Sequence, residues 1–241
     1  MTVFKLCPTT CLSCGHAFEV DISFGLDGKR QRNVRERLMA GTYQVYPCPA
    51  CKVTAVYESP MIYTDFERGE YVAMETARSA AKQTALARHE TIFRDCFECG
   101  PPIAQELGAR VKRRIVYGFG ALREKLRLWD AGLDDRIVEA VKGDLVDQEG
   151  YHPATVMLRL AALLDGGHLM FGIYPPIDPP EDLPPDKPWV APPSPALDFV
   201  TAPAAMYQSR SAEPSKLERD FPWIGDDWLV DVHDGPSYLY R

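Results

Sequence analysis

The residues of this sequence best suited to chemistry are its cysteines, six of which form three C-x-x-C pairs. A C-x-x-C turn supplies two thiolates from one loop, and two such turns complete the four-sulfur tetrahedron that a zinc ion prefers. The two pairs nearest the N-terminus are Cys11 with Cys14 and Cys48 with Cys51. We therefore predict that zinc is the cofactor and that these four cysteines are its ligands.

The residues around these pairs are typical of a zinc ribbon, in which each ligand loop adjoins a β-strand. Gly15 follows the first pair, where such a loop often needs a positive φ. The pairs are separated by more than the ~15–20 residues of compact zinc sites, which leaves room for an inserted helix. Four thiolates leave no open coordination position, so a structural role is favoured over a catalytic one. The alternative is that these cysteines are core thiols or a redox pair.

Three cysteines lie outside this predicted site: Cys7, Cys96 and Cys99. Cys96 and Cys99 could bind a second metal together with Cys7 and with His89 or His16. They could instead form a dithiol redox site, because a C-x-x-C pair can lower the pKa of one thiol. They could also be small side chains that pack at a helix end. The sequence leaves these three interpretations open.

No catalytic residue is predicted. The five histidines match no metalloprotease or nucleophile signature, and Gly118-Phe119-Gly120 is too short for a phosphate-binding loop. Adjacent acids, such as Asp134-Asp135 and Asp226-Asp227, suit helix caps and solvation better than acid–base catalysis. The sequence leans against an enzyme.

Charge gives little support for nucleic-acid binding. The formal net charge of −7 argues against a general affinity for nucleic acids or anionic lipids. Two basic runs nevertheless keep a nucleic-acid-associated zinc ribbon as an alternative, although solvated helix faces explain such runs more often. The runs comprise Lys29, Arg30, Arg32, Arg35 and Arg37, and Arg110, Lys112, Arg113 and Arg114 with Arg123, Lys125 and Arg127.

The pattern of the chain predicts an α+β fold in three zones. Residues 1–75 are expected to form a zinc-ribbon-like β domain. Its expected strands are 17–24, 53–57, 61–63 and 71–74, with a helix at 31–40 ended by Gly41.

Residues 76–174 are expected to be a helical region that ends in a β-hairpin. Residues 76–97 contain no glycine or proline and predict a long helix, followed by helices near 103–110, 121–129 and 133–145. The sequence Asp165-Gly166-Gly167 suits the turn of a hairpin within 155–174, although residues 158–164 could equally form a short helix.

Residues 175–241 are expected to be a proline-rich strap with an acidic, aromatic tail. Ten prolines lie between Pro175 and Pro195, which favours an extended conformation; by composition alone a disordered linker is an equal alternative. Trp189, Trp223 and Trp228 suggest that this tail docks, either on its own body or on another chain. We therefore expect a protein partner, or self-association, through the C-terminal tail.

Membrane association is not expected. No stretch approaches the ~20 apolar residues that a membrane helix needs. Residues 1–5 do not have the pattern of a signal peptide. We expect a soluble, cytoplasmic protein.

The order of motifs resembles the CpXC family. The shared features are C-x-x-C-G, a strand, a helix containing Arg35 to Leu38, the sequence PCPAC, another strand and then Met61 to Asp65. Residues 115–146 are also similar to the segment that follows the domain in longer members. The resemblance covers residues 7–146 and departs at Leu12, where the family usually has proline. It implies a bacterial origin and a metal site, and it brings no activity with it.

The function favoured by the sequence is therefore non-enzymatic. We expect a zinc-stabilised protein-interaction or scaffold protein, because a complete structural metal site is visible and a catalytic constellation is not. The alternatives are a nucleic-acid-associated zinc ribbon and a thiol-dependent redox protein that uses Cys96 and Cys99.

Overall fold

The computed structural model of the chain divides into two compact units. It describes residues 3–31, 33–76, 82–152, 155–176, 188–192, 194–225 and 228–231. Unit 1 comprises Met1–Arg123 and Asp178–Pro193, and unit 2 comprises Glu124–Ile177 and Ser194–Arg241.

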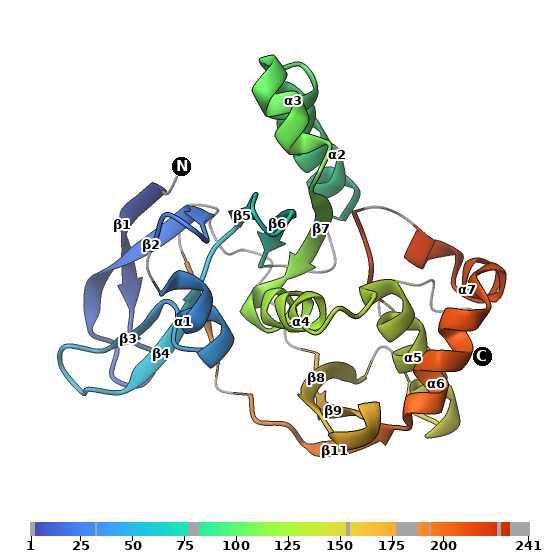
Figure 1. Ribbon diagram of the computed structural model, residues 1–241. Helices are drawn as coiled ribbons and strands as arrows, with labels where there is room; N and C mark the ends of the chain where they lie inside the picture. Colours follow the sequence, from blue (N-terminus) through green and yellow to red (C-terminus); the bar gives the residue numbers. More distant parts are fainter. Residues whose placement is uncertain are drawn as a thin grey trace. The chain divides into compact units, whose positions relative to one another are not determined.

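Unit 1 is built on a five-stranded mixed sheet with the order β1-β2-β5-β6-β7 (Figure 1). β2 buries Val20 and Ile22, as the alternating pattern of its sequence predicts. β1 and β2 pair antiparallel, as do β5 and β6, whereas β2–β5 and β6–β7 are parallel pairs. The strands are β1 (Val3–Thr10), β2 (Ala17–Asp27), β5 (Met61–Asp65), β6 (Glu70–Glu75) and β7 (Lys112–Tyr117).

A second, three-stranded sheet in unit 1 has the order β10-β4-β3. Its strands are β3 (Val45–Pro47), β4 (Thr54–Glu58) and β10 (Trp189–Ala191). Tyr57 of β4 packs with Cys7, Val20 and Ile22 in a buried apolar cluster. This cluster joins the second sheet to the β1–β2 hairpin.

Four helical segments complete the described part of unit 1 below residue 118. Helix α1 (Val34–Ala40) ends at Gly41, which adopts the left-handed conformation as expected. The others are α2 (Lys82–Phe93), the π-helical turn η1 (Arg94–Glu98) and α3 (Pro102–Gly108). The expected helix at 76–97 is therefore continued by a wider turn from Arg94, and residues 77–81 lie outside the described residues.

Unit 2 packs helices on a three-stranded sheet of order β11-β9-β8. The predicted hairpin is present, with η2 (Asp165–Gly167) as its turn. The remaining elements are α4 (Gly118–Asp130, in unit 2 from Glu124), α5 (Asp135–Gln148), β8 (Met157–Leu163), β9 (Leu169–Tyr174), β11 (Asp198–Ala202), α6 (Ala204–Ala212), α7 (Pro214–Asp220) and η3 (Pro222–Gly225).

Helix α5 is central to unit 2. Asp134 caps it by accepting a hydrogen bond from the Arg136 N–H, as its position in the sequence predicts. Its apolar side chains Val138, Val141 and Leu145 pack with residues of β8 and β9. Ala140, on another side of the helix, packs in a cluster with residues of α7 and η3.

The mixed α and β character and the N-terminal cysteine cluster agree with the sequence-based expectation. Strands β1 and β7 were not expected. The compact units also do not coincide with the three expected zones, because β7 pairs with β6 across the expected boundary at residue 75.

The expected strap lies largely outside the described residues, which omit 177–187 and 193. Its described parts include β10, paired with β4, and are followed by β11, paired with β9. Helices α6 and α7 follow the strap, in a part of the tail for which no secondary structure was predicted. Trp223 packs in the cluster around Ala140, and Trp228 is buried. Asp226, Asp227 and residues 232–241 are not among the described residues.

No helix in the described ranges combines the length and the apolar character that crossing a membrane requires.

Candidate metal centre

The first ligand loop connects β1 to β2. The Cys11 N–H donates to the His16 carbonyl and the Gly15 N–H donates to the Cys11 carbonyl, both at 2.9 Å. Gly15 has φ 72°, as its place after the pair predicts. This tight loop holds Cys11 and Cys14 on one turn.

The second ligand loop connects β3 to β4 and repeats the same hydrogen bonds. The Cys48 N–H donates to the Val53 carbonyl at 2.8 Å, and the Lys52 N–H donates to the Cys48 carbonyl at 2.9 Å. Lys52 stands where the first loop has Gly15, and its φ of 64° is also left-handed. Its ammonium group donates to the Pro49 carbonyl at 2.8 Å, a contact that holds this side chain over the loop.

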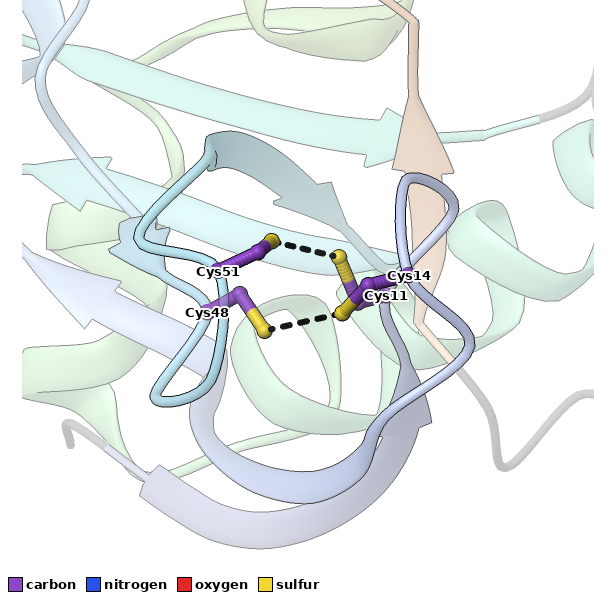
Figure 2. Close-up of side chains that lie close together, drawn as sticks. All are labelled: Cys11, Cys14, Cys48 and Cys51. Carbon is purple, nitrogen blue, oxygen red and sulfur yellow. Dashed lines mark hydrogen bonds between the residues drawn. The ribbon is translucent and has the colours of Figure 1, made fainter.

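The two loops bring all four predicted ligands together (Figure 2). The Cys11 and Cys51 sulfurs lie 3.6 Å apart, and those of Cys14 and Cys48 lie 3.7 Å apart. All four sulfurs are within 4.8 Å of one another. Zinc–sulfur bonds of about 2.3 Å in a tetrahedron place sulfurs about 3.8 Å apart, so the cluster fits such an ion.

The sulfurs differ in how readily they lose a proton. The Cys51 N–H, with help from the Ala50 N–H and the thiols of Cys11 and Cys14, lowers the pKa of Cys48 to about 6 against the effect of burial. The His16 N–H lowers the pKa of Cys14, but the three other thiols and burial outweigh it and raise that pKa to about 12. Once the Cys48 thiol has lost its proton, deprotonation of the Cys14 thiol is therefore unfavourable, because the negative charges repel each other. A cation bound among the sulfurs would reduce this repulsion.

Aromatic side chains of unit 1 lie next to the four-cysteine cluster. Tyr57 is buried, and its pKa is raised by that burial and by the nearby thiols of Cys11, Cys48 and Cys51. Phe18 contacts Tyr57 edge to face, and His16 stacks on Phe18 at a centroid distance of 6.3 Å. His16 belongs to the loop but not to the cluster of possible ligands.

The remaining candidate ligands are not brought to this centre. Cys7 is buried in the apolar cluster, whereas Cys96 and Cys99 are exposed near η1. His89 is buried and lies 2.5 Å from a Glu75 carboxylate oxygen. Across the residues that the structure describes, the four-cysteine set is the one group of three or more suitable side chains that could hold a metal.

Five members of the two basic runs pair with carboxylates, and Arg114 is buried. Arg32 lies outside the described residues. These contacts give the nucleic-acid interpretation no support, and it stays a prediction. The ion pairs are Lys29–Glu67, Arg30–Asp27, Arg35–Glu70, Arg113–Glu98 and Lys125–Glu139.

Sequence reasoning missed a buried carboxyl group at the end of β4. Burial raises the pKa of Glu58 to about 7, although the Phe119 N–H donates to it at 2.8 Å and Arg123 lies nearby. Gly118 allows this approach, because a Cβ there would lie 3.0 Å from a Glu58 oxygen. The only local feature of the sequence that could have indicated this contact is the glycine pair around Phe119. Glu58, which accepts the hydrogen bond from the Phe119 N–H, is far from that pair in the sequence.

Comparison with known proteins identifies a protein family. A family model described as CpXC protein matches residues 9–142, more than half of the chain, and includes all four clustered cysteines. No curated protein and no solved structure matches the chain.

Proposed function

Because the chain belongs to the CpXC family, we propose that its four-cysteine cluster binds one structural zinc ion and thereby organises a protein-interaction module. The observation that carries the proposal is the convergence of four sulfurs from two matching loops within 4.8 Å. The donor set consists entirely of sulfur, which favours zinc over the hard cations that prefer oxygen ligands.

The zinc ion acts as a staple in this proposal. The two ligand loops are far apart in sequence, and zinc would connect the β1–β2 hairpin to the β3–β4 hairpin. Binding of zinc to a folded site that the unfolded chain lacks contributes directly to the free energy of folding. Four protein ligands leave no position for substrate, so the ion itself is not assigned a catalytic role. Reduced thiols are needed for this site, which agrees with the expected cytoplasmic location.

The proposed interaction surface lies on the ligand loops themselves. Leu12, between the cysteines of the first loop, is 72% exposed, and Val53, just after the second pair, is 49% exposed. Each side chain sits on one of the two loops that the zinc would hold together. In this proposal the two side chains contribute apolar area to the contact with a partner protein.

The test compares charged substitutions on and off this surface. Leu12→Asp and Val53→Asp should keep their zinc but lose a cross-linked protein partner that the unmodified protein captures in its native extract. Leu163→Asp is the matched control, because Leu163 is also exposed, at 46%, but lies in unit 2. Identical partners for all four proteins would contradict the interaction role.

A further inference from the structure

The seven cysteines of this chain occupy three different environments. Four form the metal centre, and Cys7 is buried beside Tyr57. Cys96 and Cys99 are both exposed and lie outside the metal centre. All seven are among the described residues, and none of them forms a disulfide.

Cys96 and Cys99 lie three residues apart at the end of a helical segment. Cys96 is on the π-helical turn η1, and the Cys99 N–H closes that turn by donating to the Arg94 carbonyl at 2.8 Å. In an α-helical turn, side chains three residues apart lie on the same side of the helix, with Cβ atoms ~5–6 Å apart. The π-helical turn η1 is wider, and a disulfide needs Cβ atoms about 4 Å apart. Tightening this turn would therefore bring the two thiols toward bonding distance.

At Gly100 the backbone comes close to the Cys96–Cys99 turn. A Cβ at this position would lie 2.5 Å from the Cys96 carbonyl oxygen, so the close approach requires glycine. Pro101 then begins the connection to α3. The chain is thus already compact around the two thiols.

Phe97, one of the two residues between the cysteines, connects this turn to the core of unit 1. Phe97 packs against Phe93 at 4.8 Å, Phe66 at 5.6 Å and Tyr71 of β6 at 5.9 Å between ring centroids. Tightening the turn between Cys96 and Cys99 therefore changes the position of Phe97 in this aromatic cluster.

The same turn borders a cavity of about 380 Å³ whose lining includes Phe93, Phe97 and Arg113. Arg113 stacks over the Phe93 ring at 4.9 Å and pairs with Glu98 at 3.5 Å. Glu98 also lies between the two cysteines. A change of the turn is thus transmitted to an ion pair and a cavity as well as to the apolar core.

We propose that Cys96 and Cys99 form a second functional site, a dithiol that exchanges with disulfides of low-molecular-weight thiols and so switches the conformation of η1. One cysteine thiolate attacks a sulfur of the external disulfide, which forms a mixed disulfide and releases one external thiolate. The other cysteine thiolate then attacks its neighbour, which closes the Cys96–Cys99 bond and releases the second external thiolate. Two electrons pass to the external disulfide, and the two cysteine protons are taken up by the released thiolates.

The experiment equilibrates the full, zinc-loaded chain in buffers of increasing oxidised-to-reduced glutathione ratio and then alkylates the remaining thiols. Trypsin releases residues 95–110 as one peptide, which contains Cys96 and Cys99 and no other cysteine. The expected product is this peptide with an internal disulfide, while the zinc content of the chain stays unchanged. Two alkylated thiols at every ratio, or disulfides only between chains, would overturn the proposal.

Single substitutions give the second readout. Either Cys96→Ser or Cys99→Ser should accumulate a glutathione adduct, because the variant that keeps the attacking cysteine cannot complete the second step. Absence of an adduct from both variants would argue against exchange. A loss of bound metal from the Cys96→Ser, Cys99→Ser double variant would also overturn the proposal, because it would indicate a second metal site. The readout on residues 95–110 does not depend on whether the four-cysteine cluster binds zinc.

Discussion

At the scale of single residues, the two ligand loops adopt the same left-handed backbone conformation with different residues. The fifth residue of each loop, counted from its first cysteine, is left-handed: Gly15 with φ 72° and Lys52 with φ 64°. Glycine adopts this conformation without strain, whereas lysine does so at a cost. The Lys52 contact with the Pro49 carbonyl offsets part of that cost.

Gly15→Ala should lower the free energy of unfolding by about 1–2 kcal/mol through backbone strain. No atom lies within 4 Å of the added Cβ, so steric overlap plays no part. Gly120→Ala is the control: its Cβ also meets open space, but this residue lies in helix α4, where alanine is favoured by about 1 kcal/mol. Denaturant unfolding of zinc-loaded protein measures both, and equal effects of the same sign would refute the strain argument.

Glu58 should make stability depend on pH. Its folded pKa of about 7 lies above the ordinary 4.5, so the folded state favours the protonated form. This contribution is complete below about pH 4.5 and is lost as pH rises through about 7. Glu58→Gln, which keeps an acceptor for the Phe119 N–H, should therefore be more stable than the unmodified chain by about 3 kcal/mol near pH 8 and no more stable near pH 4. Unfolding curves at both pH values test this, and an effect independent of pH would count against it.

Site residues could be predicted from the sequence where their partners lie close by along the chain. C-x-x-C spacing identified the four clustered cysteines because each pair is preorganised by its own loop. Glu58 could not be identified in this way, because its partner is the N–H of Phe119, which only the folded chain brings near.

At the scale of elements, helix α5 is joined to the unit 2 part of α4 by buried ion pairs. Lys142 of α5 lies 2.9 Å from Glu124 of α4 and 2.9 Å from Glu139 of its own helix. All three side chains are buried, and Lys125 lies 3.0 Å from Glu139 as well. Buried charges of this kind tolerate the loss of a partner poorly.

Lys142→Met should destabilise unit 2 by about 3–5 kcal/mol, because it leaves buried carboxylates without one of their cations. Lys216→Met is the matched control, since Lys216 pairs with Glu213 at the surface. Its loss should cost at most about 0.5 kcal/mol. Thermal unfolding measures the difference, and comparable losses in the two variants would contradict this account of α5.

Elements whose apolar residues recur with a clear period could be predicted from the sequence. An element that begins with several charged residues could not. β2 alternates and buries alternate side chains, so its sequence indicated a strand. β7 begins with Lys-Arg-Arg, and these three residues were interpreted only as part of a basic run. It becomes a strand because it pairs with β6, an interaction distant in sequence that local patterns do not contain.

At the scale of the whole molecule, the two units have separate apolar cores. The four-cysteine cluster lies in unit 1, and the apolar cluster around Val138, Val141 and Phe171 lies in unit 2. Removing zinc with a chelator under reducing conditions should increase amide hydrogen exchange in β1–β4 and leave β8 and β9 protected. Equal loss of protection in both units would contradict this division. Cys48→Ser serves as the control, because a chelator should cause no further change in it.

The central claim is that four sulfurs bind one zinc ion, and zinc-edge X-ray absorption on protein of measured metal content tests it most directly. The account predicts one zinc per chain, four sulfur neighbours at about 2.3 Å and no nitrogen or oxygen neighbour. The signal should persist when Cys96 and Cys99 are both serine. A chain purified without zinc, or a zinc ion with fewer than four sulfur neighbours, would contradict the account.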